Sequence, residues 1–229
     1  MNPLFGPYVK TVRFFYLLKN RGWRVEGAPV DGPAVYLVHH QNLAGPVCAE
    51  ALLDAPVHMW SLHYFLTRRD CFAQYYGYTF TARFGWPRPA AWLAARALSL
   101  VIPPLMRSLQ AIPVYRGARE ILATMDASAD ALLAGESLLI CPDQAYDSDS
   151  PALGQLYNGF FHLEKPYFKK TGRHLSFVPL YRSTARKTLY VGRPLAFTGN
   201  APFRRERDEL TDLLRARMND MGRAAGDIS

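Results

Sequence analysis

The alternation of short apolar segments with helical segments is the feature that most constrains the fold. Four segments are rich in β-branched and large apolar side chains, as buried strands are: AVYLVHH at 34–40, VHMWSL at 57–62, AIPVY at 111–115 and SLLIC at 137–141. Helical spacing follows each time, as at 118–134 before Gly135. Because parallel strands need crossover connections, this order predicts an α/β protein with a mixed, largely parallel sheet covered by helices.

The remaining segments continue the same pattern. We expect a helix at 159–170, strands at 175–181 and 187–192, and a closing helix at 204–221. A chain of 229 residues is long enough to bury one sizeable core. We therefore predict a single domain over residues 1–229.

The N-terminal segment, residues 1–30, begins with an amphipathic helical pattern at 4–19. Its apolar stripe consists of Val9, Val12, Phe15 and Tyr16, and its cations Lys10, Arg13 and Lys19 lie elsewhere. This pattern predicts a membrane-associating helix.

A second apolar segment, residues 72–107, is predicted to be a helical insertion. Its stretch at 89–106, PAAWLAARALSLVIPPLM, approaches spanning length but contains Arg96 and the Pro103-Pro104 pair. We interpret it as a helix that lies on or dips into a bilayer. An apolar helix packed in the core is an equally open alternative.

The formal net charge of +8 favours a polyanionic partner, either nucleic acid or an anionic membrane surface. Because no nucleic-acid module accompanies the basic residues, we expect the membrane surface and no nucleic acid. Three widely spaced cysteines indicate a reducing compartment, and the N-terminus does not have the pattern of a cleaved secretory signal. These features predict a peripheral protein on the cytoplasmic face of a membrane.

The strand at 34–40 delivers His39 and His40 to its own end, immediately before a turn and a helix. Histidine suits general-base chemistry because its pKa lies near neutrality. A histidine that only satisfies backbone hydrogen bonds is the structural alternative.

The order of the motifs resembles that of the lysophospholipid and 1-acylglycerol-3-phosphate acyltransferase family. HHQNLAGP is similar to the family's first motif, with His40 at the catalytic position and His39 before it. AIPVYRG, which contains Arg116, is similar to the second. Cys141, Pro142, Asp143 and Gln144 are similar to the third, and the Val178, Pro179 and Leu180 run is similar to the fourth. The resemblance covers nearly the whole chain.

This resemblance implies acyl transfer from acyl-CoA or acyl carrier protein to a lysophospholipid or glycerol-phosphate hydroxyl in phospholipid biosynthesis. It implies no cofactor or metal beyond the acyl donor as co-substrate. His40, or His39 in its place, would act as the base, and Asp143 would be the acidic residue of the third motif. The substrate-binding residues would be Arg116 as the phosphate contact, Asn42, Pro142 and Gln144.

One position departs from the family pattern, because Gly45 stands where the first motif has aspartate. A histidine without its orienting carboxylate loses much of its catalytic power. Asp143, Glu50 and Asp54 are the candidate replacement acids. A catalytically impaired relative that acts as a lipid-binding or membrane scaffold protein is the alternative function.

Two other chemistries are weaker. A metal site would need His39, His40, His58 and His63, but their spacing gives no compact ligand face. Cys48 and Cys141 as nucleophiles are disfavoured because a buried cysteine is usually part of the core.

Overall fold

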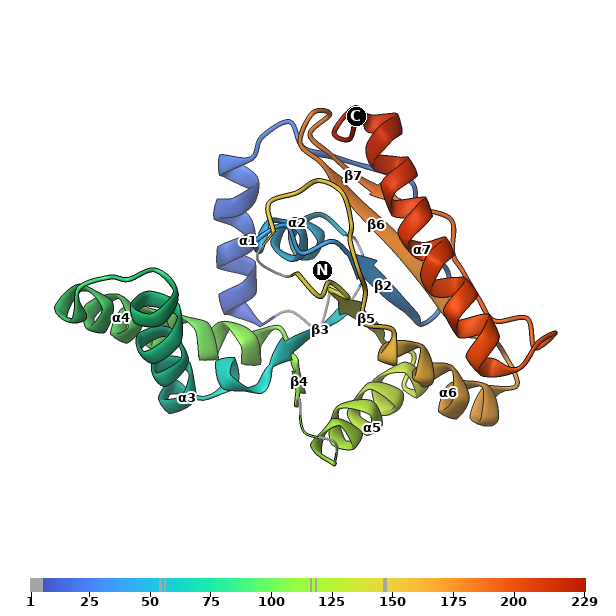
Figure 1. Cartoon of the computed structure of the whole chain (residues 1–229), viewed down its shortest axis with the longest axis horizontal. Helices are drawn as coiled ribbons and strands as arrows, with labels where there is room; N and C mark the ends of the chain where they lie inside the picture. Colours follow the sequence, from blue (N-terminus) through green and yellow to red (C-terminus); the bar gives the residue numbers. More distant parts are fainter. Residues whose placement is uncertain (1–5, 54, 56, 116, 118, 146–147) are drawn as a thin grey trace.

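A seven-stranded sheet organises the chain in a computed structural model that describes residues 6–53, 55, 57–115, 117, 119–145 and 148–229 (Figure 1). The strands are β1 (Arg24–Glu26), β2 (Ala34–Val38), β3 (Val57–Leu62), β4 (Ile112–Val114), β5 (Ser137–Ile140), β6 (Ser176–Ser183) and β7 (Thr188–Val191). The helices are α1 (Pro7–Lys19), α2 (Ala44–Leu52), α3 (Arg68–Ala73), α4 (Arg88–Ser108), α5 (Glu120–Leu133), α6 (Glu164–Thr171) and α7 (Phe203–Ala225). Short helical turns are η1 (His63–Leu66), the π-helical η2 (Gln74–Arg83) and η3 (Gly159–Leu163).

The strand order is β1-β7-β6-β2-β5-β3-β4. All neighbouring strands pair in parallel except β6 and β7, which form an antiparallel hairpin. The predicted mixed, largely parallel α/β sheet is therefore confirmed. Strand β1 was not predicted because its three residues are exposed and carry no apolar pattern.

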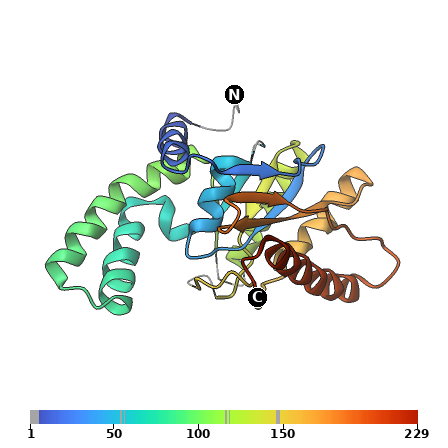
Figure 2. The ribbon, with the colours of Figure 1, turned by 90° about the horizontal axis from the view of Figure 1, so that it is seen from above.

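Helices cover both faces of the sheet because successive side chains of a strand point to opposite faces. On β2, Val35 and Leu37 join the core beneath α5, α6 and α7, whereas Tyr36 and Val38 join the core beneath α1 and α2. The turned view shows α1 and α7 on opposite sides of the sheet (Figure 2). Strand β2 is buried along its whole length, so its carboxyl end lies at the centre of the molecule.

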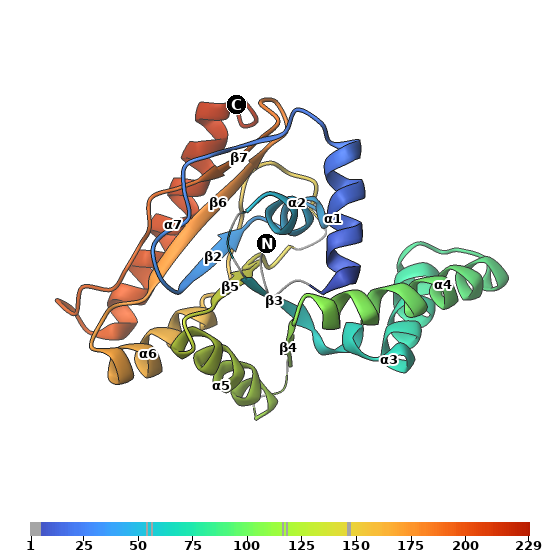
Figure 3. The ribbon, with the colours of Figure 1, turned by 180° about the vertical axis from the view of Figure 1, so that it is seen from behind.

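The segment between β3 and β4 forms a helical arm of α3, η2 and α4 that projects from the sheet (Figures 1 and 3). Its own small core contains Phe80, Ala91 and Ala95. Helix α4 buries Ala91, Ala95, Ser99 and Pro103 at four-residue spacing. The predicted apolar helix thus lies outside the main core and packs through its small residues.

Helix α4 is, in the described part of the chain, the one helix long and apolar enough to cross a membrane. Over the relevant window it has a mean hydropathy of 1.3, and 22% of that window is buried within the protein. A buried core helix passes the same test of length and composition, but little of α4 is buried.

Helix α1 contacts the protein through only part of its predicted apolar stripe. The protein-facing residues are Val9, Arg13 and Tyr16, and the predicted stripe residues Val12 and Phe15 are exposed. Arg13, expected on the polar side, donates its Nε–H to the Ala51 carbonyl at 2.8 Å. The exposed surface of α1 consequently combines large apolar side chains with Lys10 and Lys19.

The contact between α1 and α2 places a buried carboxyl group next to Arg13. Neither carboxylate oxygen of Glu50 has a hydrogen-bond partner among the described residues. Burial raises the pKa of Glu50 to about 8, and the charge of Arg13 lowers it only in part. Glu50 is therefore mostly protonated at neutral pH.

We expect Glu50→Gln to stabilise the protein more at pH 8.5 than at pH 5. Between the ordinary pKa of 4.5 and about 8, folded Glu50 keeps a proton that the unfolded chain has released, so the wild type loses stability as pH rises. Glutamine has no charged form, and its advantage should grow by about 3–4 kcal/mol between these two pH values. Urea unfolding at both pH values measures the change, with the exposed Glu26→Gln as control. A pH-independent difference would contradict a proton bound at Glu50.

Candidate active site

Two histidines and one carboxylate meet at the carboxyl end of the parallel strands. His39 and His40 follow β2, and Asp143 lies three residues beyond β5, the strand that pairs with β2. One carboxylate oxygen of Asp143 binds His39 Nδ1, and the other accepts the His40 backbone N–H at 2.9 Å. The edge where parallel strands end is where sites form in such folds, and Asp143 joins both histidines there.

His39 is buried and held at both ring nitrogens. Its Nδ1 faces Asp143, and its Nε2 lies 2.8 Å from the Ser150 carbonyl oxygen. Because both partners are acceptors, the ring donates from both nitrogens and carries a positive charge. Burial lowers the pKa of His39, but the hydrogen bond and charge of Asp143 and the Ser150 carbonyl outweigh burial and raise it overall.

His40 is half-buried and has a different hydrogen-bonding state. The backbone N–H of Leu43 donates to His40 Nδ1 at 3.1 Å. A neutral imidazole that accepts at Nδ1 carries its proton on Nε2. The carboxylate of Asp143 contacts the backbone of His40 and the side chain of His39, so the acid orients His39.

The loop after these histidines has an unusual backbone. Gln41, Asn42 and Leu43 have φ values of 43°, 50° and 75°, a left-handed conformation that residues with side chains seldom adopt. Such conformations cluster at functional sites, where the surrounding structure holds them. Here the turn brings the Leu43 N–H back to His40 and starts α2 directly behind the site.

Gly45 has no room for a side chain. A Cβ atom at this position would lie 1.7 Å from the His39 carbonyl oxygen and 2.9 Å from its carbon. The first turn of α2 therefore packs directly against the backbone of β2's end. The carboxylate that contacts His39 comes from Asp143, in the segment after β5.

Comparison with known proteins gives a fold-level likeness. No protein-family model matches the sequence. No curated protein matches it either. The structure is similar to that of the 1-acyl-sn-glycerophosphate (LPA) acyltransferase PlsC from Thermotoga maritima, with 10% identity and a TM-score of 0.48 over 92% of this chain and 82% of that one. A match at this level does not assign an activity.

The predicted substrate-binding residues are placed as follows. Pro142 is buried and Asn42 is exposed. Gln144 is fixed by its N–H to the Gln155 carbonyl at 3.1 Å and by its side chain to the Leu156 carbonyl at 3.2 Å. Arg116, the predicted phosphate contact, lies outside the described residues, as does the candidate acid Asp54.

Two other sequence proposals do not meet at this site. Glu50 is a candidate replacement acid, but its carboxylate oxygens accept no hydrogen bond from the described residues. His58 bonds the Gln110 carbonyl at 2.9 Å and Glu136 at 2.6 Å near the start of β3, whereas His63 follows the end of that strand. The four histidines considered for a metal are thus spread along the sheet, and no group of three metal-binding side chains occurs among the described residues.

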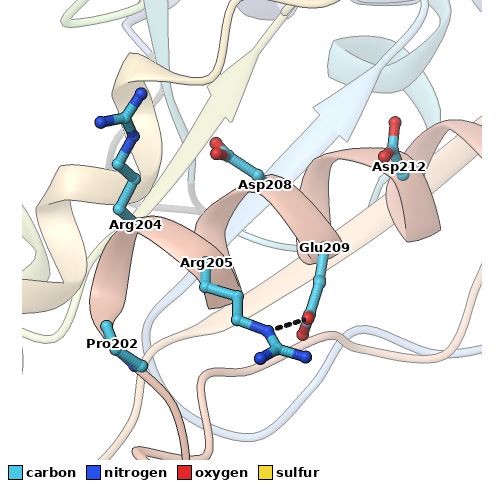
Figure 4. Close-up of a pocket in the computed structure, with 6 residues that line it drawn as sticks. All are labelled: Pro202, Arg204, Arg205, Asp208, Glu209 and Asp212. Carbon is cyan, nitrogen blue, oxygen red and sulfur yellow. Dashed lines mark hydrogen bonds and ion pairs between the residues drawn. The ribbon is translucent and has the colours of Figure 1, made fainter.

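Surface hollows occur away from the histidines. One, of about 510 Å³, lies along the first turns of α7 and is lined by Pro202, Arg204, Arg205, Asp208, Glu209 and Asp212 (Figure 4). Arg205 and Glu209 form an ion pair at 2.9 Å across it. Its mixed charges do not suit an acyl chain.

Sequence reasoning missed Arg182 and Tyr115 and considered His63 only as a metal ligand, although all three lie at the same edge of the sheet. Arg182 is near the end of β6, and its Nη1 donates to the Gln41 side-chain oxygen at 3.2 Å. His63 and Tyr115 follow β3 and β4, and their rings stack with centroids 4.9 Å apart. Each residue ends or follows a predicted strand, which is the signal that would have identified them.

Proposed function

We propose that this protein is a peripheral membrane acyltransferase that uses His39 and Asp143 at the carboxyl edge of the sheet. The bridge from Asp143 to both histidines is the observation that carries the proposal, because it gives one imidazole an orienting acid. The acyl donor would be acyl-CoA or acyl carrier protein, and the acceptor a lysophospholipid or glycerol phosphate.

The chemistry requires a base for the acceptor hydroxyl. In the proposed reaction, His39 Nε2 takes the hydroxyl proton while the oxygen attacks the thioester carbonyl carbon. The C–S bond then breaks, and the imidazolium returns the proton to the leaving thiolate. The acceptor hydroxyl would take the place of the Ser150 carbonyl at Nε2. Because the pKa of His39 is raised, activity should increase as pH rises and the ring loses its proton.

An apolar and basic surface supports the location at a membrane. The exposed side chains on α1 include Phe14 and Phe15, at 62% and 61% exposure, and those on the arm include Trp92 and Leu93, at 50% and 66%. Helix α1 begins against the end of α4, where the Gly6 N–H donates to the Ser108 carbonyl at 3.1 Å. The two helices therefore meet at these ends.

The net positive charge is concentrated in the two segments that contain α1 and the arm. Residues 1–25 contain five Lys or Arg and no acid, and residues 63–108 contain six Arg and one acid. The rest of the chain has 16 basic and 18 acidic residues. Aromatic side chains beside cations fit the interface of an anionic bilayer.

The second candidate is a membrane lipid-binding protein without transferase activity. It is favoured by one observation, that the backbone occupies His39 Nε2 and His40 Nδ1. Both candidates share the membrane surface and differ only in acyl transfer.

A single set of proteins tests both parts of the proposal. Purified wild type, His39→Asn and His40→Ala are incubated with anionic liposomes, labelled acyl-CoA or acyl carrier protein, and lysophospholipids. Asparagine can keep the hydrogen bond to Asp143 without the basic nitrogen, so we expect His39→Asn to fold, to bind liposomes and to lose transfer by at least a hundredfold. Transfer lost only in His40→Ala would assign the base to His40. Liposome binding by the wild type without transfer from either donor would leave the lipid-binding candidate.

Liposome flotation of Leu93→Ser tests the surface in the same experiment. Removing a leucine that is buried in the bilayer should weaken binding about tenfold or more. Leu122→Ser, on α5, is the matched control because Leu122 is 60% exposed but lies outside the proposed surface. Equal binding by the two variants would contradict membrane docking through the arm.

A further inference from the structure

Arg182 holds a positive charge for which the described residues provide no counter-ion. It is half-buried near the carboxyl end of β6. Its Nη1 donates to Gln41 Oε1 at 3.2 Å and to Thr184 Oγ1 at 3.0 Å, and its guanidinium lies 4.8 Å from the ring centre of Trp23. All of these partners are uncharged.

The hydroxyl and the thiol beside Arg182 supply no negative charge at neutral pH. The guanidinium also faces the Tyr16 hydroxyl and the Cys48 thiol, and burial raises the pKa of Tyr16 to about 12 and that of Cys48 to about 11. Asp227, on the neighbouring C-terminal segment, accepts the Thr184 and Ala185 N–H groups with one oxygen. No ion pair joins Asp227 to Arg182 in the described chain.

One donor of Arg182 also lacks an acceptor. Its buried Nε–H has no hydrogen-bond partner among the described residues. A partly buried charge without a counter-ion and a buried donor without an acceptor both cost free energy. A bound anion would supply the counter-ion and the acceptor. Guanidinium groups in such settings are suited to phosphate, which they bind through parallel hydrogen bonds.

The position of Arg182 relates it to the histidines. Leu180 pairs with Val38 in the parallel register of β6 and β2, so continuing the register by two residues brings Arg182 level with His40. The strained loop after His40 directs Gln41 onto the guanidinium. An anion held by Arg182 would therefore lie level with His40, the residue next to the proposed base His39.

We infer that Arg182 and Gln41 form a phosphate-monoester subsite at the carboxyl edge of β6. The inference rests on the proposed function for the source of the phosphate, which is either the acceptor, as glycerol phosphate or lysophosphatidate, or the 3′-phosphate of a CoA donor. The residues of this subsite do not include Arg116, the phosphate contact that the resemblance implied.

Binding in the absence of any reaction tests this subsite. Isothermal titration of the wild-type protein with sn-glycerol 3-phosphate and with glycerol, and separately with CoA and dephospho-CoA, should show affinity that depends on one phosphate. Arg182→Gln should weaken that binding at least tenfold, because a charge-assisted contact to a phosphate is lost. Arg186→Gln, which removes an exposed arginine from the same hairpin, should bind as the wild type does.

Gln41→Glu separates a binding defect from a folding defect. A carboxylate at this position would pair with Arg182 and occupy the subsite, so phosphate binding should fall tenfold or more while the melting temperature is kept or raised. Dependence on the glycerol phosphate group assigns the subsite to the acceptor, and dependence on the CoA 3′-phosphate assigns it to the donor. No phosphate-dependent binding by the wild type, or unchanged binding by Gln41→Glu and Arg182→Gln, would overturn the inference. The titration does not depend on acyl transfer, so a protein that binds phosphate here but transfers no acyl group in the liposome assay would refute the enzyme and keep the subsite.

Discussion

Asp143→Ala is expected to destabilise the protein by about 3–5 kcal/mol, because it leaves the buried His39 without its counter-ion. The substitution also removes the acceptor of the His40 backbone N–H, which lies 2.9 Å from the carboxylate. A urea unfolding curve at pH 7 measures the change. Asp149→Ala, an exposed residue of the same loop, is the matched control and should change stability by less than about 0.5 kcal/mol.

The pH dependence of this effect identifies its cause. In the wild type, the raised pKa of His39 contributes stability that is present below the ordinary pKa near 6.5 and is lost as pH rises through the folded value. In Asp143→Ala, burial is opposed only by the Ser150 carbonyl and, as the larger influence, lowers that pKa, so stability is lost as pH falls. The cost of the substitution should therefore be larger at pH 5.5 than at pH 8.5. A cost that is the same at both values would show that Asp143 stabilises the fold without a charged His39.

A double-mutant cycle separates the pair from its surroundings. With His39→Leu as background, the buried charge is absent, and Asp143→Ala should cost clearly less than it does in the wild type. Equal costs in the two backgrounds would contradict a coupling between these side chains.

Gly45→Ala should cost about 3 kcal/mol or more, because its Cβ would overlap the backbone of β2's end. The clash is with the His39 carbonyl oxygen, 1.7 Å away, and backbone atoms cannot move aside as a flexible side chain can. Thermal unfolding of the purified variant measures the loss. Gly77→Ala is the control, since a Cβ there meets nothing within 4 Å and alanine favours a helix over glycine by up to about 1 kcal/mol.

Gly45→Asp extends this test to function. It restores the residue that the family motif has, yet the same clash should prevent it from folding normally, so no acyl transfer should be gained. A stable Gly45→Asp variant with increased transfer would mean that α2 can move away from β2, and that the acid of the first motif can be rebuilt in place.

The sequence determined the elements of this fold because strand and helix patterns are local. The strand at 57–62 was predicted at the residues of β3, and the others differ from the observed strands by one or two residues at an end. The order of strands and helices then allowed few arrangements other than a largely parallel sheet. The two histidines could be placed at a strand end for the same reason.

Only the tertiary structure decided which groups meet. His39 and Asp143 are 104 residues apart, and no periodicity shows that the acid contacts the ring of His39 and only the backbone of His40. The orientation of α1 is a similar case, since Arg13 faces α2 while Phe15 faces outward, and helical spacing does not tell which side meets the protein. Contacts between distant segments depend on the order in which the strands pair in the sheet. The contact of Asp143 with His39 and the uncompensated charge of Arg182 were therefore visible only in the folded chain.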